Sequence, residues 1–96
     1  MAMYNPPHPG EFIKDIYLIP HGITSRQAAN NLGVSPSTFT RLIKGESNIS
    51  PDMALRLSKV FGRSPESWLA MQDSFSLWHS KQTLDLSNLV KFKLAG

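Results

Sequence analysis

The chain has 96 residues, of which 41% are hydrophobic and 18% charged, a composition typical of a globular chain and not of a disordered one. This length suffices for one small domain with a single core and is too short for two. The absence of cysteine excludes disulfides and thiolate metal sites. No apolar run has the length of a membrane span and no secretory signal pattern opens the chain, so we expect a cytoplasmic protein.

The net charge of +3 is concentrated in the middle of the chain. Between Thr24 and Arg63, six basic residues stand against two acidic ones, which gives this segment a net charge of +4. The rest of the chain has four basic and five acidic residues, a net charge of −1. A basic central segment in an otherwise nearly neutral chain favours a polyanionic partner, although small basic domains without such a partner are common.

An extended lead-in and a short helix open the chain. Three prolines within residues 5–10 remove backbone donors and predict an extended segment. Residues 11–18 then carry apolar side chains on one face, which predicts a short amphipathic helix: Phe12, Ile13, Ile16 and Tyr17. Pro20 and Gly22 are expected to end this helix.

The second helix is expected over residues 24–32. Thr24 and Gln27 have the spacing of a capping box, in which each side chain accepts a hydrogen bond from the other residue's backbone N–H. Ala28, Ala29 and Leu32 form its buried side. Gly33 is expected to end the helix in a left-handed conformation.

Three later helices share one start signal, a serine followed by proline, at Ser35-Pro36, Ser50-Pro51 and Ser64-Pro65. Serine caps the first unpaired N–H groups, and proline is well suited to the first helical position. The helices are expected over residues 36–44, 51–61 and 65–81. Their apolar sides are Phe39, Leu42 and Ile43, then Met53, Ala54, Leu57, Val60 and Phe61, then Trp68, Met71, Phe75 and Trp78.

The C-terminal segment is rich in apolar residues, and Val90 to Leu94 alternate between apolar and basic side chains. This alternation predicts a short strand. A lone strand beside helices needs a partner, so it is expected either to pair across a dimer or to pack back as an arm.

Two short helices joined by a tight turn, at 24–32 and 35–44, have the organisation of a helix-turn-helix, in which the second helix enters the major groove of DNA. Gly33 permits the turn, and the apolar Val34 fills the space between the helices. The exposed side of the second helix is predicted to consist of hydrogen-bonding residues without any acid: Ser37, Thr38, Thr40, Arg41 and Lys44. Such a face is not repelled by phosphate.

Position along the motif predicts the role of each side chain. Ser37 lies near the N-terminus of the recognition helix and Arg41 one turn further on, so both are expected at base edges, Arg41 as a bidentate partner of guanine. Thr40 is expected at a base or a phosphate. The remaining predicted contacts are to phosphates for Ser25, Arg26, Ser35, Lys44, Ser47 and Asn48, and to a thymine methyl group for Pro36. Thr38 is a further candidate DNA contact. Single exposed hydroxyl residues of this kind are commonly just solvated, so the order of elements carries the prediction.

Two levels of family resemblance follow from these residues. Residues 22–45 resemble the Cro/C1-type (XRE) helix-turn-helix. Residues 7–11 (Pro-His-Pro-Gly-Glu), 48–57 and 64–69 resemble the HigA antitoxins, also called the VapI group, over about residues 6 to 80. One departure is Gln27-Ala28-Ala29, where the family carries Glu-Leu-Ala. Alanine in place of the buried leucine removes about 2–3 kcal/mol of apolar burial unless neighbouring side chains fill the space.

The resemblance implies an all-α, five-helix, lambda-repressor-like helix-turn-helix domain, which we place over residues 1–81. Residues 82–96, outside the resemblance, are expected to form a short C-terminal arm or strand that is part of the dimer interface. The resemblance implies a homodimer that binds a palindromic operator in double-stranded DNA, represses its own operon and neutralises a partner toxin, HigB, similar to the RelE mRNA interferases. It requires no cofactor or metal. A solitary regulator without a toxin is the alternative within the same family.

Two other classes of function compete with DNA binding. Three histidines lie far apart, at His8, His21 and His79, and no metal-binding pair, phosphate loop or nucleophile motif is present, so we do not expect an enzyme. The stripe that includes Phe75 and Trp78 fits a protein-interaction module as well. We expect part of this stripe to be core and these two residues to form a homodimer seam.

Overall fold

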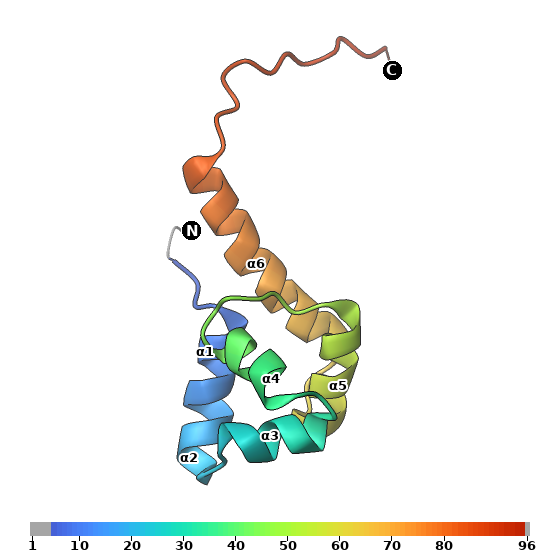
Figure 1. The fold of residues 1–96 in the computed structure, drawn as a ribbon. Coiled ribbons are helices and arrows are strands. Elements are labelled where there is room, and N and C mark those ends of the chain that lie inside the picture. The colour runs from blue at the N-terminus through green and yellow to red at the C-terminus, as the bar shows by residue number, and fades with distance from the viewer. Residues whose placement is uncertain (1–4, 96) are drawn as a thin grey trace.

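The computed structural model describes residues 5–95, and these residues form helices joined by short turns, without a strand among them. The first helical rod consists of α1 (Pro9–Ile13), the π-helical η1 (Lys14–Leu18) and α2 (Ile19–His21) without a break. The other four are α3 (Ser25–Leu32), α4 (Pro36–Ile43), α5 (Pro51–Phe61) and α6 (Pro65–Thr83), as Figure 1 shows. The expectation of an all-α fold is confirmed. None of the described helices is long and apolar enough to cross a membrane.

The predicted helix caps are present at every expected start. The Thr24 hydroxyl oxygen accepts from the Gln27 backbone N–H at 3.1 Å, and Gln27 Oε1 accepts from the Thr24 backbone N–H at 2.9 Å, which completes the capping box. The serines before α4, α5 and α6 each accept from the backbone N–H three residues further on, at 3.2, 3.1 and 3.0 Å. Each helix start is therefore determined by contacts within four residues of sequence.

The first helical rod is longer than predicted. It begins at Pro9, capped by His8, and continues through Pro20 to His21, so the expected end at Pro20 is wrong, whereas the expected end at Gly22 is confirmed: Gly22 is the left-handed C-cap at φ 63°. The reason is the wider π-helical turn, in which the Ile19 N–H donates to the Lys14 carbonyl five residues back and the chain passes Pro20 without stopping. The change of register also makes Leu18 a buried residue, whereas Ile16, expected on the inner face, is 48% exposed.

The hydrophobic core lies where the first helical rod packs against α3, α4, α5 and α6. Trp68 of α6 is fully buried and its indole Nε1 donates to the Gly62 carbonyl at 3.0 Å. Phe39 and Leu42 of α4 are buried as predicted, and so are Ala28 and Ala29 of α3. Ala28 is only 2% exposed, so neighbouring side chains close over the position where the family carries leucine.

A close approach at Gly10 joins the first rod to α4. A Cβ atom at Gly10 would overlap the carbonyl oxygen of Leu42 and crowd the backbone of Ile43. Glycine therefore permits a helix contact that no larger residue allows without movement of the main chain. This contact fixes the C-terminal half of α4 against the start of the chain.

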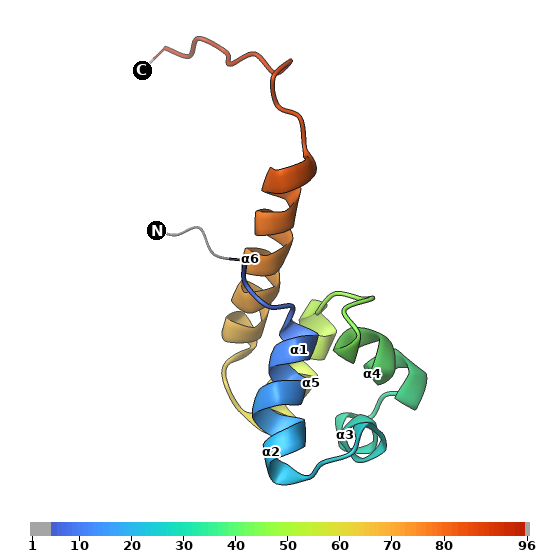
Figure 2. The same ribbon diagram turned by 90° about the vertical axis from the view of Figure 1, so that its left-hand side faces the viewer.

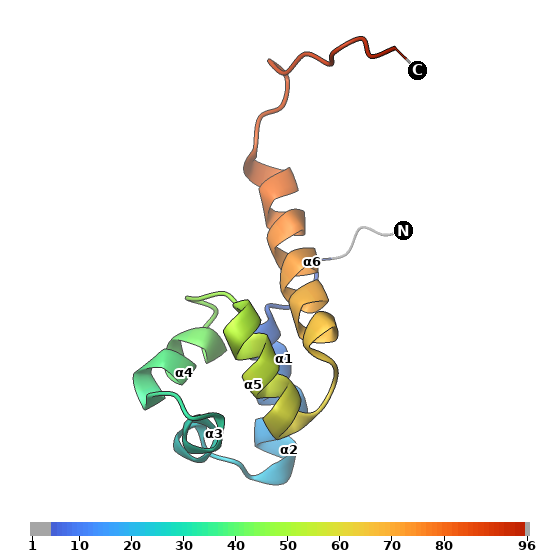
Figure 3. The same cartoon turned by 90° about the vertical axis from the view of Figure 1, so that its right-hand side faces the viewer.

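The C-terminal segment leaves the body of the molecule. The helix α6 rises from the other rods, and the chain beyond it runs on as an extended segment in the views of Figure 2 and Figure 3. Its large apolar side chains are all exposed: Leu84, Leu86, Leu89, Val90, Phe92 and Leu94. The alternative in which this segment packs back as an arm is wrong for the single chain, and the predicted strand over 90–94 is not formed there, because residues 84–95 have no neighbouring strand to pair with.

Candidate nucleic-acid interface

The helices α3 and α4 and the turn between them form the predicted helix-turn-helix. Gly33 adopts φ +73°, and the Val34 N–H donates to the Ala29 carbonyl at 3.1 Å, which ends α3 and reverses the chain. Val34 is half-buried and packs against the core, as expected for the residue between the two helices. The turn thus holds α3 and α4 in a defined crossing.

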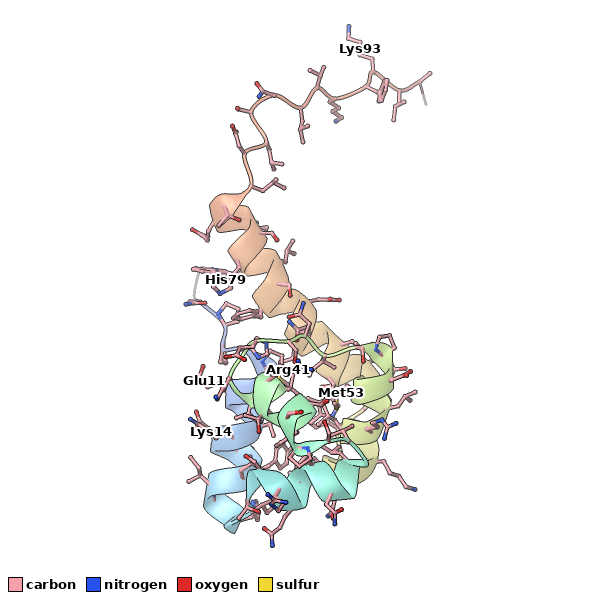
Figure 4. The ribbon with its side chains drawn as sticks, viewed as in Figure 1. Glu11, Lys14, Arg41, Met53, His79 and Lys93 are labelled. Carbon is pink, nitrogen blue, oxygen red and sulfur yellow. The ribbon has the colours of Figure 1, made fainter. Side chains whose placement is uncertain are left out.

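The outer side of α4 carries the predicted polar face. Ser37, Arg41 and Lys44 are exposed and recur three or four residues apart, so they share one side of the helix, with Thr40 half-exposed beside them. Arg41 is labelled on α4 in Figure 4. The opposite side, with Phe39 and Leu42, is buried. This outer side of α4 contains two cations and two hydroxyl groups and no carboxylate.

Three hydroxyl groups form a cluster at the N-terminus of α4. The Ser35 hydroxyl accepts from the Thr38 backbone N–H at 3.2 Å and donates to Thr38 Oγ1 at 2.8 Å. Ser37 Oγ lies 3.3 Å from Ser35 Oγ. Because the Ser35 hydroxyl caps the helix and donates to Thr38, and Thr38 is only half-exposed, the hydroxyl most available to an incoming base or phosphate at this end is that of the exposed Ser37.

A cleft of about 410 Å³ lies between the N-terminal ends of α3 and α4. It brings together Arg26, the predicted phosphate contact, and Pro36, the predicted methyl contact. It is also lined by Gln27, predicted only as the capping-box partner of Thr24, and by Asn30, which the sequence did not single out. Gln27 Oε1 is engaged in the capping box, so its amide NH₂ is the group left to donate outward. Ser25, at the start of α3, is exposed.

The loop after α4 is held on one side by His8. This side chain is 7% exposed, its Nδ1 accepts from the Gly10 N–H at 2.9 Å, and its ring lies under Gly45 and edge-on to Phe75 at 4.8 Å. Burial lowers the pKa of His8 from its usual value of 6.5, and the nearby Ser47 carbonyl and Glu11 carboxylate oppose this shift. The histidine therefore caps the first rod in its neutral form.

The same loop is held on the other side by Gln72, a buried polar residue of α6 that the sequence did not single out. Its Oε1 accepts from the Ile49 backbone N–H at 2.8 Å, and its Nε2 donates to Asn48 Oδ1 at 3.2 Å. Asn48 is exposed and Ser47 half-exposed, in positions that extend the polar surface beyond α4. No local sequence pattern signals this contact, since its partners are more than twenty residues apart.

Two of the six basic residues in the middle of the chain serve the fold. Arg56 Nη1 donates to the carbonyl oxygens of Leu32 at 2.8 Å and Gly33 at 3.3 Å, at the end of α3. Arg63, at a positive φ of 63°, donates to Ser67 Oγ at 3.0 Å, and its guanidinium lies over the ring of Phe12 at 5.2 Å. The part of the basic surface that lies on α3 and α4 is therefore carried by Arg26, Arg41 and Lys44.

The two residues predicted for a dimer seam lie on the protruding helix α6. Phe75 is half-buried between His8 and His79, whose ring centroid lies 4.3 Å from its own. Trp78 is half-buried and lines a cleft of about 270 Å³ with Leu77 and other residues at the base of the extended segment. Its indole Nε1 is buried and lacks an acceptor among residues 5–95. Figure 4 places His79 beside the N-terminal lead-in and Lys93 far from the body.

Metal ligands do not gather in the described part of the chain: no three His, Asp or Glu side chains within residues 5–95 are placed to hold one ion. His8 and His79 lie on either side of Phe75, and His21 stands at the far end of the first rod. Its Nδ1 lies 3.0 Å from the Tyr17 carbonyl oxygen of the preceding turn.

Comparison with known proteins gives one consistent family. The profile of the family described as Helix-turn-helix matches residues 13–68, more than half of the chain. The chain is 38% identical to the HTH-type transcriptional regulator YddM of Escherichia coli over 93% of this chain and 94% of YddM. It is 38% identical to the antitoxin HigA-1 of Vibrio cholerae over 75% of this chain and 68% of HigA-1. The structure of the antitoxin GraA in complex with its operator superposes with a TM-score of 0.86 at 30% identity, covering 99% of this chain and 98% of GraA.

Proposed function

The chain belongs to the Cro/C1-type helix-turn-helix family, in the group of the HigA antitoxins, and on this premise we propose that it is the antitoxin and autoregulatory repressor of a type II toxin–antitoxin system. The observation that carries the DNA-binding half of this proposal is the exposed side of α4. It presents Ser37, Thr40, Arg41 and Lys44 without a carboxylate, on a helix whose other side is anchored in the core. The family consists of DNA-binding regulators and antitoxins and is not a family of enzymes.

In the proposed complex α4 enters the major groove and α3 crosses the phosphate backbone. Arg41 binds a guanine, and Ser37 and Thr40 contact neighbouring base edges. The phosphates are bound by two groups of residues at the ends of the motif: Ser25, Arg26 and Ser35 at one end, and Lys44, Ser47 and Asn48 at the other. Pro36 meets a thymine methyl group at the mouth of the cleft, and Thr38 adds a hydroxyl contact to the DNA beside Ser35. The complex of GraA with its operator supports this assignment of the motif.

We infer further that the protein acts as a homodimer on a palindromic operator. The extended segment after α6 exposes six large apolar side chains in a single chain, between 56% and 89% each. A second copy is the partner that this segment and the Phe75–Trp78 side of α6 would bury. Residues 82–96 then form the interface arm, and residues 1–81 the DNA-binding domain. A repressor of this kind works in the cytoplasm, beside the DNA.

DNA binding is tested with the sequence upstream of the gene for this chain. Footprinting is expected to protect two half-sites separated by about one helical turn, roughly 34 Å, and affinity is expected to fall steeply with salt because phosphate contacts dominate. An upstream region without any protected site at low salt would contradict the proposal.

The antitoxin role is tested with the product of the adjacent gene. Co-expression is expected to relieve the growth arrest that the neighbouring product causes alone, and the two proteins are expected to co-purify as a complex. HigA-1 supports a HigB-like toxin as this partner. The second candidate function, a solitary regulator, is favoured by the similarity to YddM, and it is the conclusion if the neighbouring product is harmless and does not bind.

A further inference from the structure

Gln72 connects α6 to the loop that follows the recognition helix. Its side chain is 4% exposed, and both polar atoms of its amide are used. Oε1 accepts from the Ile49 N–H at 2.8 Å, while Nε2 donates to Asn48 Oδ1 at 3.2 Å and to Ser76 Oγ at 3.1 Å. One buried amide thus links two consecutive residues of the loop to the long helix α6.

The direction of each hydrogen bond follows from one fixed donor. The backbone N–H of Ile49 can only donate, so Gln72 must present its oxygen to this group. Its remaining group is the NH₂, which can only donate, so Asn48 must present its own oxygen inward. The NH₂ group of Asn48 is thereby turned away from Gln72, on a residue that is exposed.

An outward NH₂ group is the end of an asparagine amide that suits phosphate. The outward group donates, and a phosphate oxygen accepts, whereas an outward amide oxygen would be repelled by the same phosphate. Resting on the DNA-binding function proposed above, we propose that Gln72 is a positioning residue for DNA: it orients the amide of Asn48 so that its NH₂ donates to a backbone phosphate. Gln72 itself does not touch DNA.

The experiment compares four proteins: the parent, Gln72→Met, Asn48→Ala and the double variant. The probe is a mixed-sequence duplex of about three helical turns, because a phosphate contact is independent of sequence. Methionine keeps the length of the side chain and removes all three hydrogen bonds. Gln72→Met is expected to lower affinity about threefold to tenfold, the range of one hydrogen bond. In the Asn48→Ala background the same substitution is expected to change affinity by less than about twofold, since alanine cannot reach the phosphate in either protein.

Two further variants separate positioning from general weakening. Ser80→Ala removes a polar side chain at an exposed position of α6, outside the proposed interface arm, and is expected to bind like the parent. Gln72→Glu can still accept from Ile49 but cannot donate, so Asn48 must reverse its amide, and affinity is expected to fall as in Gln72→Met. The melting temperature of every variant, measured in the absence of DNA, reports any loss of folding stability.

Three results would overturn the inference. The first is a Gln72→Met protein that binds as tightly as the parent. The second is an equal loss of affinity in the parent and Asn48→Ala backgrounds, since Gln72 would then act without Asn48. The third is a parent that binds neither this duplex nor the upstream region, which would overturn the proposed function as well. The first two results leave that function intact.

Discussion

The guanidinium of Arg56 on α5 donates from Nη1 to the carbonyl oxygen of Leu32, the last residue of α3, at 2.8 Å. The end of a helix leaves carbonyl groups without partners and carries a partial negative charge, so a cation there is favourable. The same Nη1 lies 3.0 Å from where a Cβ atom of Gly33 would stand. Arg56 therefore stabilises the turn of the DNA-binding motif from outside it.

Arg56→Gln is expected to lower the free energy of unfolding by about 1 kcal/mol, since a charge-assisted bond at a partly exposed helix end is removed. For a domain of this size this corresponds to a fall in melting temperature of about 4–8 °C. The matched control is Lys59→Gln, which removes one charge from an exposed position of the same helix. Equal melting temperatures for the two variants would disprove a role for Arg56 at the end of α3.

Gly10→Ala is expected to destabilise the protein by about 1–3 kcal/mol or more, because its Cβ would overlap the Leu42 carbonyl and force the first rod away from α4. Chemical denaturation measures this loss. Gly22→Ala is the comparison, since Gly22 has a positive φ of 63° but no atom near its Cβ position. That variant suffers backbone strain alone, about 1 kcal/mol, and its unfolding midpoint is expected at a higher denaturant concentration than that of Gly10→Ala. The opposite order would show that the close approach is not tight.

Arg41→Ala is expected to weaken binding to the protected upstream site by about 1–3 kcal/mol for each guanine that the arginine binds in the parent complex. Thermal stability is expected to change little, because Arg41 is exposed. Lys44→Gln is expected to act differently. It should weaken binding to all sequences alike and flatten the salt dependence by about one unit of slope per phosphate contact. A footprint of unchanged affinity with Arg41→Ala would exclude Arg41 as the base-reading residue.

His8 makes the stability of the fold dependent on pH. Burial lowers its pKa below 6.5 in the folded state, so the unfolded chain binds the proton more tightly. The stability that neutral His8 contributes is fully present above pH 6.5 and is lost as pH falls through the lowered folded-state pKa. Protonation also removes the Nδ1 lone pair that accepts from Gly10. His8→Asn, which retains a capping oxygen, is expected to reduce this dependence in urea unfolding between pH 7 and pH 5, and an unchanged slope would contradict it.

Trp78→Ala is expected to weaken dimerisation, because it removes the largest apolar side chain at the base of the extended segment. Sedimentation velocity over a concentration series measures this change, with Lys59→Ala, at an exposed position of α5 outside the cleft, as the control. A protein with the sedimentation profile of the parent would place the dimer seam elsewhere.

The sequence by itself was sufficient for the features that depend on contacts within about four residues. The capping box at Thr24, the three serine caps before proline and the left-handed Gly33 all formed as predicted, because each satisfies local backbone groups regardless of the rest of the chain. The polar side of α4 was equally readable, since Phe39 and Leu42 must face the core and leave Ser37, Arg41 and Lys44 outside.

Only the tertiary structure decided which polar residues support that surface. Pro20 was expected to end a helix, yet a π-helical turn carries the rod past it. Arg56 and Gln72 find their partners 24 and 23 residues away, so neither contact leaves a local pattern. Short-range hydrogen bonds determine where each helix begins, whereas the path of the folded chain determines which distant amide or guanidinium reaches the ends and loops of the helix-turn-helix.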